Sequence, residues 1–196
     1  MAFRDEIARK AIHLASGLIP LAYWTVAEKW LVLCVISGLL AVAAVIEIAR
    51  RRPGPVDRFV TAWFGAMLRP FERSGLSGAT YVLLAGLITV ALYPRLIAVS
   101  AMLVLSVSDS LASLIGGRFG QARFLGGTQV GSGAFFVSAA AICMLVLPSS
   151  PVAALAAAAA ATIVEAAKFR VQGIPLDDNL TVPLTTATVL WLLVQA

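Results

Sequence analysis

The stretch Leu96–Ile115 reads LIAVSAMLVLSVSDSLASLI and is followed directly by Gly116-Gly117-Arg118-Phe119-Gly120. Its length and apolar character predict a transmembrane helix, for which about 20 residues are needed. It nevertheless contains the carboxylate of Asp109, and a charge at the bilayer centre costs at least about 3 kcal/mol on insertion scales. The presence of Asp109 therefore predicts that its carboxylate faces a charged partner, an ion or a polar cavity, near a loop that contains glycine and arginine.

The whole chain has the composition of a membrane protein. Of its 196 residues, 60% are hydrophobic and 13% are charged. A soluble domain of this length has too little interior for so much apolar surface, so we predict an all-α integral membrane protein with a single domain over residues 1–196. The first apolar run is interpreted as a retained span because no small-residue cleavage site follows it.

Seven apolar stretches predict a compact bundle of about seven transmembrane helices. Several are shorter than about 20 residues, so we expect some spans to be tilted, kinked or shielded by neighbours. The seven stretches are Ala11–Ala27, Trp30–Ala49, Gly78–Pro94, Leu96–Ile115, Ser132–Leu147, Val152–Ala167 and Leu180–Val194.

An amphipathic segment lies between the second and third stretches, over Val56–Arg73. Its apolar residues recur at helical spacing with arginines between them, which predicts a helix in the headgroup plane of the membrane. The apolar residues are Phe59, Val60, Trp63, Phe64, Met67 and Phe71, and the arginines are Arg58, Arg69 and Arg73.

The basic residues predict the orientation of the chain. With a cytoplasmic N-terminus and seven spans, all Lys and Arg residues except Lys29 and Arg95 fall on the cytoplasmic side, 13 of the 15 in the chain. We therefore predict a multi-pass protein of a bacterial or archaeal plasma membrane. The net charge of +5 is then explained by a basic cytoplasmic face with affinity for anionic membrane lipids. A nucleic-acid partner is not needed to explain this charge.

Polar and small residues form a stripe along the stretch that contains Asp109. Ser106, Asp109, Ser110, Ser113 and Gly117 follow one another mostly at steps of three or four residues, which places them on one face of a helix. This pattern favours a hydrated face on which Asp109 binds a divalent cation. Mg²⁺ typically takes one or two carboxylates together with phosphate oxygens. The alternative is a structural aspartate that is hydrogen-bonded to serines and a neighbouring helix.

A glycine-rich loop is predicted from Gly116 to Gly133. Glycines expose backbone N–H groups, a following helix start adds partial positive charge, and arginine adds bidentate contacts, so the loop is typical of a phosphate site. The alternative is a flexible connection whose arginines only set topology. The candidate phosphate ligands are Gly116, Gly117, Arg118, Gly120, Arg123, Thr128, Gly131 and Ser132.

Three acidic residues near the last two stretches are further candidates for the site. Asp177 and Asp178, followed by Asn179, enter the last span and suit either a helix cap or a metal site shared with Asp109. Glu165 lies one turn before Lys168. The two residues either form an ion pair whose charged ends reach the membrane surface, or act separately, with Glu165 as a metal ligand and Lys168 as a phosphate contact.

His13 is the single histidine of the chain. Its side chain suits either proton handling or a packing role.

These motifs, in this order, resemble the family of CTP-dependent lipid-alcohol kinases. That family includes dolichol kinase, phytol kinase and the yeast-type diacylglycerol kinase, and it is related to phosphatidate cytidylyltransferases. Family members usually carry a Lys-Ser/Thr-x-Glu-Gly-Ser sequence, whereas this chain reads Gly127-Thr128-Gln129-Val130-Gly131-Ser132. The matching segments are Arg9–His13, Glu72 with Ser77–Tyr81, Asp109–Gly120, Gly131-Ser132, Glu165 and Asp177–Pro183.

The resemblance implies transfer of the γ-phosphoryl group of CTP, or of another nucleoside triphosphate, to the hydroxyl of a lipid alcohol. Asp109 and Asp178 would bind Mg²⁺ with support from Asp177 or Glu165, and a carboxylate or His13 would orient or deprotonate the alcohol. The alternative functions are CDP-lipid synthesis, a catalytically silent scaffold and a transporter. A homo-oligomeric state is also possible on the sequence. The predicted supporting residues are Arg9, Lys10, Glu72 and Asn179.

Overall fold

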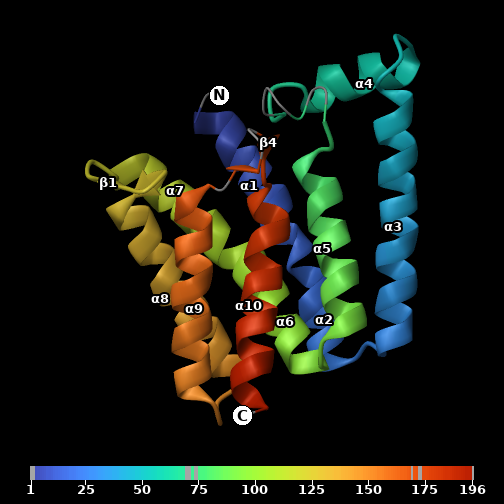
Figure 1. Cartoon of the computed structure of the whole chain (residues 1–196). Helices are drawn as coiled ribbons and strands as arrows, with labels where there is room; N and C mark the ends of the chain where they lie inside the picture. Colours follow the sequence, from blue (N-terminus) through green and yellow to red (C-terminus); the bar gives the residue numbers. More distant parts are fainter. Residues whose placement is uncertain (1–2, 69–71, 73–74, 169, 172–173, 196) are drawn as a thin grey trace.

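The computed structural model describes residues 3–68, 72, 75–168, 170–171 and 174–195, and it confirms the predicted all-α fold (Figure 1). Most helices run along the direction that joins the two ends of the molecule, whereas α4 lies across the end that carries the N-terminus; the C-terminus is at the other end. The helices are α1 (Phe3–Ser16), α2 (Leu18–Thr25), α3 (Lys29–Ala49), α4 (Pro55–Phe64), α5 (Gly78–Leu92), α6 (Arg95–Leu103), α7 (Asp109–Phe119), α8 (Gln129–Val146), α9 (Pro151–Ala167) and α10 (Asp178–Val194).

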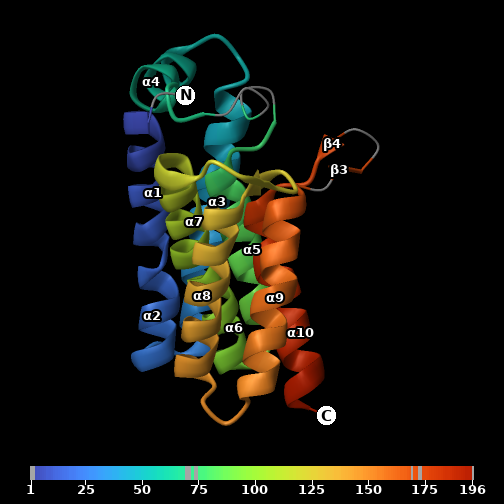
Figure 2. The same ribbon diagram turned by 90° about the vertical axis from the view of Figure 1, so that its left-hand side faces the viewer.

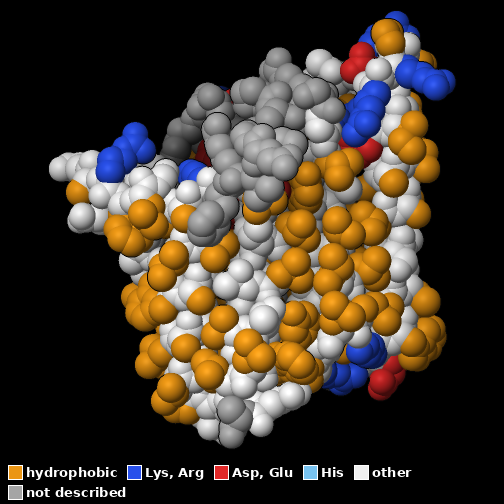
Figure 3. All heavy atoms as spheres, viewed as in Figure 1, with side chains coloured by type: hydrophobic (Ala, Val, Ile, Leu, Met, Phe, Trp, Pro, Cys, Tyr) orange, Lys and Arg blue, Asp and Glu red, His pale blue; other side chains and the backbone are white. Residues whose placement is uncertain are grey.

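Helices occupy all seven predicted apolar stretches, but they differ in their ability to cross a membrane. Among the described residues, three helices are long and apolar enough for a membrane span: Lys29–Ala49, the continuous helix Arg95–Phe119, and Gln129–Val146. Helices α5, α9 and α10 are apolar but shorter. On the face in Figure 3, hydrophobic side chains cover the middle of the molecule, and Lys and Arg gather toward its two ends.

The central element is the helix that contains Asp109. Helices α6 and α7 are joined by a π-helical segment, η2 (Val104–Ser108), so the backbone continues from Arg95 to Phe119 without a loop. Its buried residues pack on α8, where Phe135 is fully buried. The sequence pattern predicted a helix here but not the π-helical turn. Such turns are rare and recur at functional sites.

Alanine allows the last helices to pack closely. Ala154, Ala157, Ala158 and Ala161 of α9 are all 0% exposed, and α9 packs against both α8 and α10. Small side chains let helix backbones approach each other within a membrane. The alanine-rich run therefore serves the close packing of α9 against α8 and α10.

The first predicted span is bent. Helices α1 and α2 meet at Gly17, where an added Cβ would lie 3.0 Å from the Leu14 carbonyl oxygen and 3.4 Å from Ser106 Cβ. A larger residue would therefore push this bend away from the central helix. Helix α2 continues into a second apolar cluster that contains Tyr23, Ile36 and Met102.

The amphipathic segment between α3 and α5 is helical in its first part. Helix α4 covers Pro55–Phe64, and its residues Phe59 and Trp63 are 58% and 70% exposed, as a helix at a membrane surface requires. The predicted members Arg69, Phe71 and Arg73 lie outside the described residues.

The glycine-rich segment is more ordered than the predicted loop. Residues 116–119 belong to α7 and residues 129–133 to α8, so the connection covers 120–128. It contains an antiparallel hairpin of β1 (Arg123–Phe124) and β2 (Gly127–Thr128). A similar hairpin, β3 (Arg170–Val171) and β4 (Ile174–Pro175), joins α9 to α10. Both hairpins lie at the same end of the molecule as the N-terminus (Figure 2).

Candidate functional site

The partner of Asp109 is a buried lysine from the first helix. Lys10 of α1, 1% exposed, donates a hydrogen bond through Nζ to Oδ2 of Asp109, which is 5% exposed. His13 Nε2 lies 3.3 Å from the same oxygen and 3.0 Å from the Leu105 carbonyl oxygen. Each of these two buried ions reduces the free-energy cost of burying the other. Either ion alone would be strongly unfavourable in this interior. Lys10 was predicted only as a supporting residue.

Polar contacts continue along α1 and α7 on both sides of this pair. Toward the N-terminus, the Ser113 hydroxyl donates to Glu6 Oε1 at 2.6 Å, and Arg9 donates to the same carboxylate at 2.6 Å and 3.1 Å. In the other direction, the Ser16 and Ser106 hydroxyls are 3.0 Å apart. Because these contacts repeat at every turn, the two helices are held in one register.

Glu6 lies before the first predicted span, and its surroundings stabilise the ionised form. Burial raises the pKa of its carboxyl group, but the hydrogen bonds from Arg9 and Ser113 outweigh burial and lower the pKa to about 2. Glu6 therefore stays ionised at neutral pH and holds Arg9 and Ser113, of which Ser113 lines a polar cavity.

A polar cavity of about 230 Å³ lies beside the Lys10–Asp109 pair. Helix α1, helices α7 to α10 and the β1–β2 hairpin all contribute residues to it. Many of the predicted site residues therefore lie together, although they come from distant parts of the sequence. The lining residues are Lys10, Asp109, Ala112, Ser113, Gly116, Gly117, Arg123, Gly126, Gly127, Thr128, Gly131, Ser132, Glu165, Lys168 and Asp178.

Charges of both signs face this cavity. Besides the Lys10–Asp109 pair, the cavity is lined by two carboxylates, Glu165 and Asp178, and by two exposed cations, Arg123 and Lys168. Carboxylates bind hard cations and guanidinium or ammonium groups bind phosphate, so one cavity carries the groups for a metal–phosphate complex.

The start of α8 presents polar groups to the same cavity. The Thr128 hydroxyl caps this helix by accepting a hydrogen bond from the Gly131 N–H at 3.2 Å. Ser132 is 6% exposed, and its hydroxyl has no hydrogen-bond partner among the described residues. A buried hydroxyl without a protein partner is costly unless a ligand or water meets it. Ser132 therefore offers a hydroxyl group to a ligand or a water molecule in the cavity.

Two glycines of this region lie where helices α7 and α8 pack closely against each other. A Cβ on Gly131 would lie 3.0 Å from the Ala112 carbonyl oxygen, and a Cβ on Gly116 would lie 3.1 Å from Gly131 Cα, so α7 and α8 touch through their backbones here. The Gly120 N–H donates to Gly116 and the Gly126 N–H to Ala166. These two N–H groups therefore have backbone acceptors, and phosphate binding by the rest of the glycine-rich segment stays a prediction.

Some predicted residues lie elsewhere. Arg118 is exposed beside Phe119, with its guanidinium carbon 5.6 Å from the ring centroid, and it does not line the cavity. Asp177 caps α10 by accepting hydrogen bonds from the backbone and side-chain N–H groups of Asn179 at 2.9 and 2.7 Å. Of the two predicted roles for Asp177, helix cap and metal ligand, the observed contacts are those of a helix cap.

Glu72 belongs to a polar network that supports the start of α10. Two members of this network, Arg50 and Glu47, were not predicted as site residues. Arg50 donates to the Glu72 carbonyl oxygen at 2.7 Å and forms an ion pair with Glu47 at 2.5 Å. Glu72 in turn accepts a hydrogen bond from the Gly78 N–H at 3.2 Å. An added Cβ on Gly78 would meet Asn179 at 3.0 Å, so this network packs directly against the helix that carries Asp178.

The donor set fits a metal that arrives with phosphate better than a metal held by protein alone. In the described part of the chain, no group of three or more His, Cys, Asp or Glu side chains is arranged to hold a metal ion. The predicted quartet Asp109, Asp178, Asp177 and Glu165 is therefore not gathered around one point. Glu165 and Asp178 line the cavity, and Mg²⁺ commonly uses one or two carboxylates plus phosphate oxygens.

The fold and the cavity together define an all-α protein with membrane-spanning helices and a charged site near one end of the helix bundle. The chain is similar to the uncharacterized protein RP860 of Rickettsia prowazekii (strain Madrid E), with 29% identity over 191 residues, 93% of this chain and 92% of that protein. No family model matches the chain. No solved structure matches it either.

Proposed function

We propose that this protein is a Mg²⁺-dependent lipid-alcohol kinase of a bacterial or archaeal plasma membrane. It transfers the γ-phosphoryl group of CTP, or of another nucleoside triphosphate, to a long-chain alcohol. In this proposal all seven apolar stretches span the membrane, the N-terminus is cytoplasmic, and the cavity faces the cytoplasm. The distribution of 13 of the 15 basic residues on that side supports the orientation.

The observation that carries the proposal is the mixed charge of the cavity. Phosphoryl transfer depends on positioning and on neutralising the charge of the phosphates more than on covalent catalysis. The cavity combines three cations, three carboxylates and the Ser132 hydroxyl within about 230 Å³. A transporter would need polar groups through the full thickness of the membrane.

Each charged group then has a role. Arg123 and Lys168 contact the phosphates from the hairpin and the end of α9, and Lys10 contacts them from the floor of the cavity. Asp109 holds Lys10 and His13 in place. Glu165 and Asp178 are the residues that would hold Mg²⁺, which neutralises phosphate charge when it is bound.

The reaction is balanced with these groups. The lipid hydroxyl oxygen attacks the γ-phosphorus, and the bond from that phosphorus to the β–γ bridging oxygen breaks. The nucleoside diphosphate leaves, and the hydroxyl proton passes to a base. His13 suits this base through Nδ1, because its Nε2 faces two acceptors, the Leu105 carbonyl oxygen and Asp109 Oδ2, and therefore already carries a hydrogen.

The test is an assay of the purified protein with Mg²⁺, labelled CTP or ATP, and a panel of lipid alcohols, followed by mass spectrometry. We expect a phosphorylated alcohol and a nucleoside diphosphate. Release of pyrophosphate with a CDP-lipid would replace the kinase by a cytidylyltransferase. The absence of both nucleotide binding and turnover would leave a silent scaffold.

Two arginines provide a matched pair of variants for the same assay. Arg123 lines the cavity, whereas Arg118 is exposed beside Phe119. Arg123→Ala should raise the KM for nucleotide about tenfold, the value of one charge-assisted contact of about 1.4 kcal/mol. Arg118→Ala should leave it close to that of the wild type, and the reverse order would move the phosphate site away from the cavity.

A further inference from the structure

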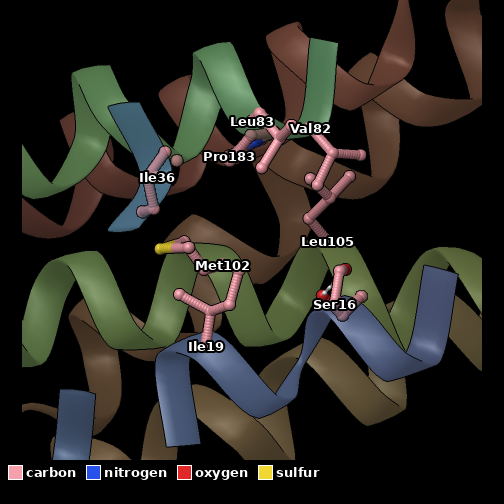
Figure 4. A pocket seen from close by; sticks show the side chains of 10 residues that line it. Ser16, Ile19, Ile36, Val82, Leu83, Met102, Leu105 and Pro183 are labelled. Atoms are coloured by element: carbon pink, nitrogen blue, oxygen red, sulfur yellow. Dashed lines mark hydrogen bonds between the residues drawn. The ribbon is translucent and has the colours of Figure 1, made fainter. Parts of the chain in front are cut away.

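A second cavity lies deeper in the helix bundle, on the other side of Asp109. Its walls are apolar and come from α2, α3, α5, α6 and α10, with Ile19, Ile36, Leu83 and Met102 around it (Figure 4). Its volume is about 10 Å³, which is room for about one water molecule. One end is polar, because the hydroxyl groups of Ser16 and Ser106 lie there and bond to each other.

The two cavities share one face of the central helix. Met102 and Ser106 line the apolar cavity, and Ser113 and Gly116 line the charged one, with Asp109 between them. These residues follow one another at steps of three or four, and Ser106 and Asp109 both contact α1, which places them on one side of the central helix. The polar end of the apolar cavity is therefore next to His13 and Asp109, since His13 contacts the Leu105 carbonyl oxygen at 3.0 Å.

We propose that the apolar cavity is the closed form of a binding site for the hydrocarbon segment next to the hydroxyl group of a long-chain alcohol. This inference rests on the proposed function. The alcohol has one polar oxygen atom at the end of an apolar chain. The cavity likewise has a polar end, at Ser16 and Ser106, and apolar walls over the rest of its length. The hydroxyl lies at Ser16, Ser106 and His13, facing Asp109 and the phosphates, while the chain continues between α2, α3 and α5.

Two side-chain features let this site open without moving a helix. Gly86 of α5 contributes no side chain, and the space that its Cβ would take is limited by Met102 Cε at 3.0 Å and Ile36 Cδ1 at 3.6 Å. Methionine has three rotatable bonds and fills irregular gaps. A rotation of Met102 therefore enlarges the cavity along the surface of Gly86.

The test blocks this space while leaving the nucleotide site unchanged. Gly86→Leu places a branched side chain where the alcohol would lie. Gly38→Leu is the matched control, because an added Cβ on Gly38 of α3 meets nothing within 4 Å. A long-chain alcohol that carries a diazirine near its hydroxyl is the probe, and the crosslinked peptides are mapped by mass spectrometry.

We expect wild type and Gly38→Leu to crosslink through α2, α5 or α6, and Gly86→Leu to lose crosslinking there by at least about tenfold. The Kd for nucleotide, measured by equilibrium binding without the alcohol, should stay the same in all three proteins. If Gly86→Leu melts at a lower temperature than Gly38→Leu, Met102→Phe narrows the same space from α6 and should give the same loss. Equal crosslinking in the blocked and control variants, or crosslinks confined to the outer face of α3, would overturn the inference.

The result also separates this inference from the proposed function. Wild-type crosslinking at the cavity without transfer to any alcohol would remove the kinase proposal and leave the lipid site standing. Transfer by the wild type that is unaffected by Gly86→Leu and Met102→Phe would retain the kinase and remove the lipid site.

Discussion

Lys10 and Asp109 form a buried ion pair although they are 99 positions apart in the chain. The pair joins α1 to the central helix and lies at the boundary between the charged cavity and the apolar one. It therefore has both a structural and a chemical role, and the two can be separated by mutation.

The first prediction concerns the removal of this pair. Lys10→Met or Asp109→Asn leaves one buried group without its partner, and breaking a buried pair typically costs about 3–5 kcal/mol. The double variant Lys10→Met/Asp109→Leu should recover most of the melting temperature in detergent, since no charge is left uncompensated. It should still lack transfer activity, and a stable double variant with normal turnover would show that the pair is purely structural.

The second prediction concerns Ser132. Its hydroxyl has no partner among the described residues, so Ser132→Ala should leave the melting temperature unchanged or raise it slightly. The KM for nucleotide should rise by a factor of about 5–10, the value of a single hydrogen bond. Ser138→Ala on the same helix is the control, because that hydroxyl bonds to the Ala134 carbonyl oxygen of its own helix at 2.7 Å. Identical nucleotide binding in both variants would contradict a ligand role for Ser132.

The third prediction tests the contact between α7 and α8. Gly131→Ala should destabilise the protein by about 1–3 kcal/mol through overpacking, because the added Cβ meets the Ala112 carbonyl oxygen and Thr128. Gly133→Ala, two residues along the same helix, has open space and should stabilise the protein by about 0.5–1 kcal/mol. Thermal unfolding in detergent measures both, and equal melting temperatures would show that the helices are not in backbone contact.

The fourth prediction follows from the low pKa of Glu6. The folded-state pKa is about 2 and the ordinary value is 4.5, so the stabilisation is fully present above about pH 4.5. It is lost as the pH falls from about 4.5 towards 2, because the unfolded chain then binds a proton that the folded chain does not. Melting temperatures of wild type and Glu6→Gln should converge over this range, and parallel curves would contradict the prediction.

Hydropathy predicted the helices because membrane-spanning segments are set by length and apolar composition. It did not predict the π-helical turn at Val104–Ser108 or the two short hairpins, which depend on local hydrogen-bond geometry. Sequence alone also does not show which glycines lie at close helix contacts. The structure shows such contacts at Gly116 and Gly131, and their predicted role in phosphate binding stays a prediction.

The acidic, basic and hydroxyl residues of the cavity were largely predicted from their types, but their pairing was not. Asp109 was expected to bind metal, and its observed partner is Lys10. One signal in the sequence favours this partner. Glu6, Lys10 and His13 recur at steps of four and three, which matches the polar stripe Ser106, Asp109 and Ser113 on the central helix. Two polar stripes on apolar helices satisfy each other best when they face one another.

The distance in sequence between Lys10 and Asp109 also affects how the protein is made. The ribosome adds about 5–20 residues per second, so Asp109 is synthesised about 5–20 seconds after Lys10. In the proposed seven-span topology, the ammonium group reaches water at the membrane surface through its flexible stem during that interval. The first helix would then reach its final depth late in biosynthesis, once the central helix is inserted beside it.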